Sequence, residues 1–416
     1  MTQNVLRIAL VSAEFAGSAN SGGIGTYMRN VADMLADDGH EVEVFAAGQN
    51  AAVEFLGNGV RLNLIDSPIR ADFPEAIAPV LRERHGHWRF DVAEGAEFLA
   101  ETSACSRLVP DLPLVLKLHT PSALIANIDR SFVTTAAKAR FVVGGLLRGR
   151  IGQPFWKYDR AQDFERENLF CADAVTSPCR AMVDQLAQLW EIDTSQVSVI
   201  PNVFAVPPPL LDIPSLTKTG VVSFFGRLEL RKGVLDFAEI IPRVLAAEPD
   251  TRFRFVGRSI PHPWLKRDLR ELLQERLAQH AASIEWIDGV PYDEALALYA
   301  TTDICVYPSV WENFPNVCLE AMAAARGVVA SSAGGMAEII EHGRTGLLVP
   351  PRSPAATAEA IIALLRDPER RAVMGAAARD HIVAAYAPEV ILPLQIAAYE
   401  RAIARAAVRD PLRRYQ

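Results

Sequence analysis

Two glutamates eight residues apart form the part of the sequence whose chemistry is easiest to interpret. Glu312 stands in a loop-like stretch after a short apolar run, and Glu320 follows inside a predicted helix, flanked by Leu319, Ala321 and Met322. A carboxylate among such apolar neighbours is costly to bury without a partner. Glu320 therefore requires hydroxyl donors, such as a ribose diol, or a cation, and an internal salt bridge is the plainer alternative.

A second segment, residues 225–233, is a basic turn between a predicted strand and a predicted helix. Arg227 and Lys232 are five residues apart in that turn. A planar guanidinium and an ammonium at this spacing could bracket a diphosphate. The alternative is that both are solvated cations at a loop tip.

A third segment, residues 21–26, contains Gly22 and Gly23 at the predicted start of the first helix. Glycines let a backbone approach a phosphate, and a helix N-terminus favours negative charge. A simple turn followed by a helix is the alternative. Dinucleotide binding is disfavoured, because the glycines do not follow the strand directly and the second strand ends without an acidic residue to hold a ribose.

These segments lie between alternating predicted strands and helices. In the first half, apolar runs at 7–13, 41–46, 60–65, 114–118, 172–177 and 197–200 predict buried strands. Residues 202–218 carry four of the 27 prolines and predict a linker. The pattern restarts with strands at 221–225, 253–257, 284–287, 304–307, 328–330 and 346–349, and a last helix covers 387–409. The order predicts an α/β protein with two doubly wound parallel sheets.

Composition narrows the class of protein. The chain has 416 residues, 42 basic and 50 acidic, and a net charge of −8. This acidic balance argues against nucleic-acid binding. No apolar run is long enough to predict a membrane-spanning helix, and the N-terminus lacks a signal-peptide pattern. The five cysteines form no C-x-x-C motif, which fits a reducing cytoplasm.

The stretch from Glu312 to Glu320 matches the E-x7-E signature of retaining glycosyltransferases of the GT-B fold, family 4, and the chain resembles that family over most of its length. The glycine loop, residues 226–233, 255–257 and 287–290, and the glycines at 334–346 occur in the family's order. The resemblance implies two facing Rossmann-like domains with an interdomain cleft. Residues 1–205 would form the acceptor domain, 206–386 the nucleotide-sugar donor domain, and 387–416 a helix crossing back to the first.

The same resemblance implies roles for the charged residues. Arg227 and Lys232 would hold the donor diphosphate and neutralise the leaving nucleotide. Glu320 would accept hydrogen bonds from ribose hydroxyls, and Glu312 would contact the transferred sugar. His119, just after a predicted strand, would lie near the transferred sugar and the acceptor, as an orienting group rather than an obligatory base.

The remaining implied contacts with the donor come mostly from the main chain. The loop of Gly22 and Gly23 would close on a phosphate from the first domain. Backbone at the helix start, contributed by Asn313, Phe314, Asn316 and Val317, would meet the sugar and phosphates. The main chain at Val290, in the loop after a strand, would face the base.

The sequence departs from the family pattern in three places. The first glutamate is commonly followed by G-F-G, but here by Asn313-Phe314-Pro315, and because proline has no N–H the amide contacts pass to Asn316 or Val317. Residues 201–205 lack the usual glycine, and Arg258 stands where glycine or aspartate is frequent. No D-x-D motif occurs, so no metal or other cofactor is expected.

We therefore expect a hexosyltransferase that moves a sugar with retention from a nucleotide diphosphate sugar, UDP- or GDP-linked, to a saccharide or lipid-linked saccharide in polysaccharide or glycoconjugate synthesis. Two alternatives are a non-catalytic nucleotide-sugar-binding subunit of a polysaccharide assembly complex and a nucleotide-sugar 2-epimerase, which uses a different set of carboxylate and histidine residues.

Two stretches bear on membrane contact. Residues 137–158 are apolar and basic, which indicates either a peripheral membrane anchor or a flap over the acceptor. The terminal helix spaces Arg401, Arg405, Arg409 and Arg413 by four, which indicates a solvated face or an anion-binding one. We therefore expect a cytoplasmic protein with peripheral contact at the inner face of the cell membrane.

Overall fold

The computed structural model describes residues 5–17, 22–149, 157–259 and 267–409. The chain forms two compact units. The first comprises Met1–Leu124, Asp159–Ala205 and Tyr386–Gln416, and the second comprises Ile125–Tyr158 and Val206–Ala385. The C-terminal helix thus groups with the first unit, whereas residues 125–158 group with the second and not with the domain that the sequence suggests for them.

The first unit contains one sheet whose strands follow short apolar runs. They are β1 (Arg7–Val11), β2 (Glu41–Gly48), β3 (Ala52–Phe55), β4 (Arg61–Asp66), β5 (Val92–Ala96), β6 (Leu114–Lys117), β7 (Ala174–Ser177) and β8 (Val197–Val199). The strand order is β3-β4-β2-β1-β5-β6-β7-β8. Every pair is parallel except β3 with β4. The exposed edge strand β3 has no buried side chain, and the sequence pattern does not predict it.

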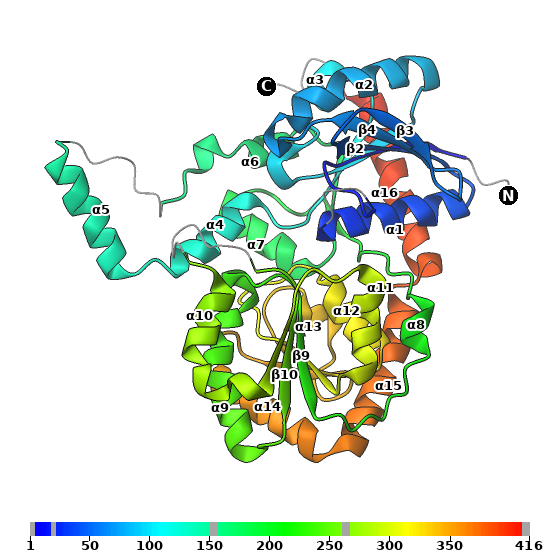
Figure 1. Ribbon diagram of the computed structural model, residues 1–416. Coiled ribbons are helices and arrows are strands. Elements are labelled where there is room, and N and C mark those ends of the chain that lie inside the picture. The colour runs from blue at the N-terminus through cyan, green and yellow to red at the C-terminus, as the bar shows by residue number, and fades with distance from the viewer. Residues whose placement is uncertain (1–4, 18–21, 150–156, 260–266, 410–416) are drawn as a thin grey trace. The chain divides into compact units, whose positions relative to one another are not determined.

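Helices cover this sheet on both faces (Figure 1). They are α1 (Gly23–Asp37), α2 (Phe73–Trp88), α3 (Ser103–Leu108), α6 (Phe164–Leu169), α7 (Arg180–Trp190) and α16 (Pro388–Val408). Helix α4 (Ser122–Ser131) begins in the first unit, but most of its residues group with the second. The buried faces of α1 and α16 share one apolar core with β1, β2 and β4. This shared core anchors the last helix to the first unit.

Strand β5 was not predicted, because its sequence VAEGA breaks the apolar pattern. Its central residue, Glu94, is fully buried. The Glu94 carboxylate accepts hydrogen bonds from Tyr27 of α1 and from Gln395 and Tyr399 of α16. Donors from two helices therefore make a polar residue acceptable in the middle of the sheet.

The second unit contains a six-stranded sheet, entirely parallel, with helices on both faces. Its strands are β9 (Val221–Phe225), β10 (Arg252–Val256), β11 (Ile284–Ile287), β12 (Ile304–Tyr307), β13 (Gly327–Ser331) and β14 (Leu347–Val349), in the order β11-β10-β9-β12-β13-β14. Its helices are α8 (Pro208–Leu211), α9 (Phe237–Ala247), α10 (Leu269–Arg276), α11 (Tyr292–Ala297), α12 (Asn316–Ala323), α13 (Met336–Ile339), α14 (Pro354–Arg366) and α15 (Pro368–Ala385). Helices α9, α10 and α14 share the main apolar core.

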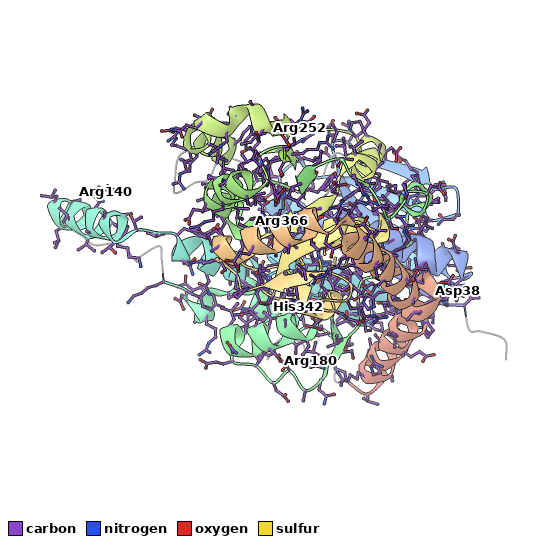
Figure 2. All side chains as sticks on the ribbon, turned by 90° about the horizontal axis from the view of Figure 1, so that it is seen from below. Asp38, Arg140, Arg180, Arg252, His342 and Arg366 are labelled. Atoms are coloured by element: carbon purple, nitrogen blue, oxygen red, sulfur yellow. The ribbon has the colours of Figure 1, made fainter. Side chains whose placement is uncertain are left out.

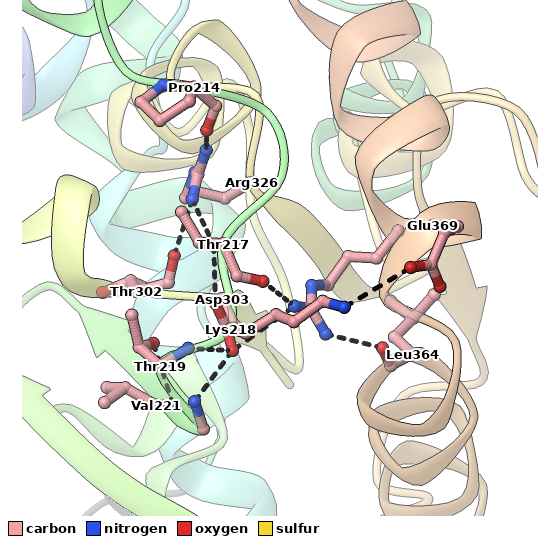
Figure 3. A network of polar contacts seen from close by, with 12 residues as sticks. Pro214, Thr217, Lys218, Thr219, Val221, Thr302, Asp303, Arg326, Leu364 and Glu369 are labelled. Carbon is pink, nitrogen blue, oxygen red and sulfur yellow. Dashed lines mark hydrogen bonds and ion pairs between the residues drawn. The ribbon is translucent and has the colours of Figure 1, made fainter.

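Buried arginines tie the proline-rich linker to this second unit (Figure 3). Arg326 is 1% exposed and donates to the carbonyls of Pro214 and Thr302, the latter at 2.9 Å. Burial lowers the pKa of Arg326 to about 10. Asp303 accepts from the backbone N–H of Thr219 and pairs with Arg371 of α15 at 3.3 Å. The linker is therefore held by hydrogen bonds and is an ordered part of the unit.

The stretch Pro368–Val408 is long and apolar enough by composition to cross a membrane. It consists of two helices, however, and Ala387 between them has extended backbone angles. In α16, Arg401 donates to Ser198 at 2.9 Å, Arg405 to the Asp173 carbonyl at 3.1 Å, and Arg409 pairs with the Asp173 carboxylate. These bonds give the arginines partners on the first unit, while Arg401 and Arg405 remain exposed, and the choice between a solvated and an anion-binding face stays a prediction. Arg413 lies outside the described residues.

Candidate active site

The loops that follow β9 and β12 meet at the carboxyl edge of the second sheet. The two strands are neighbours, with β10 and β11 on one side of them and β13 and β14 on the other. A point where connections diverge in this way is where parallel α/β sheets usually hold their ligands. The fold thus brings residues 226–233 and 308–315 to the position where a ligand is expected.

Glu312 is the centre of this arrangement. Its side chain is 6% exposed and binds Lys232 Nζ at 2.6 Å and Arg231 Nη1 at 3.0 Å. The Ser309 hydroxyl donates to it at 3.1 Å. Burial alone would raise the pKa of Glu312, but the two cations outweigh it and lower the pKa to about 2. Glu312 is therefore ionised at neutral pH, and its charge holds both cations in place.

Arg231 is a site residue that the sequence did not single out. Its side chain is 13% exposed and also pairs with Glu229 at 3.1 Å. Arg227, which the sequence did single out, is 58% exposed and bonds to the other oxygen of Glu229 at 2.7 Å. The structure therefore brings Lys232 and Arg231 together on Glu312. Arg227 is connected to this group only through Glu229.

Two glycines allow neighbouring loops to pack closely against the 308–315 loop. Gly233 has a φ of 67°, and a Cβ there would lie 1.9 Å from the Pro308 carbonyl oxygen. Gly334 has a φ of 63°, and its Cβ would lie 1.9 Å from the Glu312 carbonyl oxygen. Only glycine fits either position. The glycine motif at 334–335 thus supports the backbone of Glu312.

Glu320 lies on α12, and the residue is 7% exposed. Tyr299 donates to one oxygen at 3.0 Å and Tyr292 to the other at 3.2 Å. Burial raises the pKa of Glu320, while the two phenols partly oppose this effect. Among the residues that the structure describes, Glu320 has hydroxyl donors and no salt-bridge partner, which favours hydroxyl binding over the internal ion pair that the sequence left open.

The start of α12 carries the remaining residues of the E-x7-E segment. Asn313 and Phe314 are buried in the loop, and Asn316 and Val317 are half-buried in the first turn. The Tyr307 hydroxyl donates to the Val317 carbonyl at 2.6 Å and fixes that turn. The N–H groups of a first helical turn have no partner within the helix and can face a ligand.

Val290 lies between β11 and α11, two residues before Tyr292. It is half-buried and follows Gly289, whose φ is 60°. The loop of Val290 is therefore connected to Glu320 by the hydrogen bond that Tyr292 donates to that carboxylate. Arg258 is exposed in this structure.

His119 lies in the first unit, directly after Leu118 at the end of β6. Its backbone N–H donates to Glu97 Oε2 at 2.7 Å, and its ring packs edge-on against Tyr27 with centroids 5.1 Å apart. Burial, followed by the charges of Lys117 and Arg70, lowers the pKa of His119 to about 3. The imidazole is therefore neutral at pH 7 and is suited to hydrogen bonding rather than to taking up a proton.

Gly22 and Gly23 begin α1 in the first unit. A Cβ at Gly22 would lie 2.4 Å from Glu14 Oε2, whereas a Cβ at Gly23 would meet nothing within 4 Å. Glu14 also accepts from the Gly25 N–H at 3.4 Å and pairs with Arg70. A carboxylate therefore stands beside this helix start, a feature that the motif alone does not reveal. Ser21 lies outside the described residues.

Three buried glutamates that the sequence did not single out organise the loops around His119. Glu97 accepts from His119 as above, and Glu165 accepts from the N–H groups of Leu99 at 2.7 Å and Ser122 at 2.8 Å. Glu101 accepts from the Ala13 N–H at 3.0 Å. The one available signal for Glu97 and Glu101 is the E-x2-E-x3-E spacing that they form with Glu94, which by itself is compatible with an exposed helix, and Glu165 has no such signal.

No group of three or more histidine, cysteine or carboxylate side chains within the described ranges could hold a metal ion. The sequence expectation of a metal-free site remains a prediction at this point.

Comparison with known proteins shows sequence similarity in both units. Residues 22–203 match a family model described as a glycosyl transferase 4-like domain, and residues 219–367 match one described as glycosyl transferases group 1. Glycogen synthase from Mycobacterium tuberculosis is 25% identical over 403 residues, which cover 91% of this chain and 90% of that protein.

Two solved structures extend the likeness to the fold. Sucrose-phosphate synthase from Thermosynechococcus elongatus has a TM-score of 0.71 at 22% identity, covering 96% of this chain and 99% of the other. The Anabaena protein HepE, solved in complex with UDP-glucose, has a TM-score of 0.64 at 18% identity, covering 94% and 98%.

Proposed function

Since the chain is a glycosyltransferase of the group 1, family 4 type with the GT-B fold, we propose that it transfers a hexose to a hydroxyl acceptor with retention of the anomeric configuration. One observation supports this most directly. Lys232 and Arg231 meet on Glu312 at the switch point of the second sheet, and Glu320 with its hydroxyl donors follows eight residues later on α12. Cations and a hydroxyl-binding carboxylate on one loop and helix suit an anionic, polyhydroxylated ligand.

In this proposal Lys232 and Arg227 bind the donor diphosphate, and Arg231 joins them. Glu320 accepts from the ribose and Glu312 from the transferred sugar. Main chain at Asn316 and Val317 meets the phosphates at the start of α12.

The chemistry needs charge stabilisation more than proton transfer by a side chain. As the bond from the sugar to the diphosphate breaks, negative charge grows on the leaving phosphate, and fixed cations and helix N–H groups stabilise it. The leaving phosphate oxygen then takes the proton of the acceptor hydroxyl, which attacks from the same face. We propose that no metal is required, and a transfer rate that stays unchanged in excess EDTA is the expected result.

We propose a UDP- or GDP-linked donor, with UDP favoured because the structurally similar HepE was solved with UDP-glucose. A thermal-shift screen with UDP, GDP and ADP separates these donors. The nucleotide that raises the melting temperature most is then tested as its hexose conjugates. Proton NMR of the product distinguishes retention from inversion. Nucleotide binding with no transfer to any saccharide would instead indicate a non-catalytic subunit.

We assign acceptor binding to the first unit, with His119 as an orienting hydrogen-bonding group. Its neutral imidazole and fixed backbone suit that role. The loop of Gly22 and Gly23 is proposed to contact a donor phosphate, with Glu14 beside it. Replacement of His119 by glutamine should therefore lower transfer while leaving nucleotide affinity intact, and equal losses in both would contradict the division of roles.

We further propose that the enzyme works in the cytoplasm and touches the inner face of the membrane through α5 (Thr135–Leu147). Leu146 is 63% exposed and Leu147 84% exposed. Figure 2 shows the side chain of Arg140 on this helix, and the sequence from 130 to 158 has basic residues but no acidic one. Exposed leucines among cations suit an anionic lipid surface.

Flotation with vesicles containing anionic lipid tests this contact. We expect retention at low salt, loss of retention at high salt, and loss on replacing Leu146 and Leu147 by serine. No retention at low salt would leave α5 as a flap over the acceptor.

A further inference from the structure

Both oxygens of the Glu320 carboxylate are occupied by phenols of the same chain. Tyr299 donates to Oε2 at 3.0 Å, and Tyr292 donates to Oε1 at 3.2 Å. A buried carboxylate is costly when it lacks donors, and these two hydroxyls supply them. Glu320 is therefore satisfied before any ligand arrives.

The two phenols differ in how firmly they are held. Tyr299 is fully buried, and its ring stacks on Phe225 with centroids 4.1 Å apart and an interplanar angle of 19°. Tyr292 is the first residue of α11 and is 52% exposed. Tyr299 cannot leave without opening the core, whereas Tyr292 can rotate into solvent.

Building on the function proposed above, we propose that the Tyr292 hydroxyl occupies the place on Glu320 that a ribose hydroxyl of the donor nucleotide takes, and competes with the nucleotide for it. A phenol and a ribose hydroxyl are both neutral O–H donors, so either one satisfies the same carboxylate oxygen. Tyr292 also follows Val290 by two residues, and that loop is the one assigned to the base. The phenol thus stands at the nucleoside end of the site.

This competition makes Tyr292 a specificity-determining residue. A ribonucleotide replaces the phenol with an equivalent donor and the carboxylate keeps two partners. A deoxynucleotide that lacks the relevant hydroxyl cannot take the place of the phenol, so Tyr292 stays on Glu320. Tyr292 therefore lowers the affinity for the ribonucleotide and not for the deoxynucleotide, and its removal should widen the preference for the ribonucleotide.

Calorimetric titration with UDP, in the absence of any acceptor, tests the proposal on the full chain. We expect Tyr292→Phe to lower the Kd for UDP by about three- to tenfold, because the nucleotide then displaces water instead of a hydrogen-bonded phenol. The gain should vanish with 2′-deoxy-UDP or with 3′-deoxy-UDP, whichever lacks the hydroxyl that binds Glu320. It should also vanish in a Glu320→Gln background.

Tyr299→Phe is the matched control, because it removes the other phenol from the same carboxylate. That hydroxyl donates to Glu320 with and without the nucleotide, so its loss should not strengthen UDP binding. Equal or weaker UDP binding by Tyr292→Phe would overturn the competition while leaving the proposed function intact. If the wild-type chain binds none of UDP, GDP and ADP, the proposed function itself fails.

Discussion

Replacing Lys232 by methionine removes one of the two cations that hold Glu312 while keeping most of the side-chain volume. The pKa of Glu312 is about 2 in the folded chain, against an ordinary value of 4.5. A difference of this size corresponds to about 3 kcal/mol in favour of the ionised carboxylate. The ion pair of Lys232 Nζ with Glu312 is the shorter of the two, at 2.6 Å against 3.0 Å for that of Arg231 Nη1. We assign the Lys232 ion pair about half of that free energy, on the order of 1–2 kcal/mol.

The pH dependence gives this prediction its sign. Because the pKa of Glu312 is lowered on folding, its contribution to the free energy of unfolding is complete above pH 4.5 and is lost as pH falls toward 2. The free energy of unfolding of the wild-type chain should therefore exceed that of Lys232→Met by about 1–2 kcal/mol at pH 7, and this difference should narrow below pH 4.5. Urea denaturation at a series of pH values measures it.

The same variant should lose at least tenfold in kcat/KM for the donor sugar, since a fixed cation on the leaving diphosphate contributes about 10²- to 10³-fold. Lys218→Met is the matched control. Lys218 is 63% exposed and pairs with exposed Glu369 at 3.5 Å, so its loss should change stability by under about 0.5 kcal/mol and leave transfer unaltered. A Lys232→Met enzyme with near-native transfer would refute the assignment of the cation site.

Three further outcomes follow from buried groups. Titration of the His119 ring by NMR should show a neutral imidazole at pH 5, since its pKa is about 3. Arg326→Met should lower stability by about 2–4 kcal/mol, because carbonyls of the linker lose a buried donor, whereas exposed Arg366→Met should cost under about 0.5 kcal/mol; thermal unfolding compares them. Glu94→Gln should destabilise the first unit by about 1–3 kcal/mol in hydrogen-exchange measurements, because glutamine keeps one acceptor oxygen and sets an NH2 donor against the donors that bind the other.

The sequence predicts most of the parallel strands, because their apolar runs report burial on both faces. It fails at β5, where Glu94 sits in the centre of a sheet. The partners that make this burial possible, Tyr27 and Tyr399, come from α1 and α16 at opposite ends of the chain. A pattern read along a strand cannot register donors that only tertiary folding brings to it.

The candidate site, too, could be predicted from the sequence only in part. The spacing of Glu312 and Glu320 places one in a loop and the other in a helix, as the structure does. The sequence could not show which cations face Glu312. A short 3-10 turn at Leu230–Lys232, closed by left-handed Gly233, points Arg231 and Lys232 to the same carboxylate while Arg227 stays exposed. That choice depends on one backbone turn and not on residue type.

The two glutamates of the signature are buried to a similar degree, yet their partners are of opposite kinds. Glu312 faces two cations and stays ionised, whereas Glu320 faces two neutral phenols and its pKa is raised. Exchange of the two partner sets would put two neutral phenols on Glu312 and two cations on Glu320. In the function proposed above, the observed division keeps the cations where the diphosphate is neutralised and the neutral donors where hydroxyls are exchanged. Residues eight apart can therefore serve different parts of one ligand because each loop brings its own kind of partner.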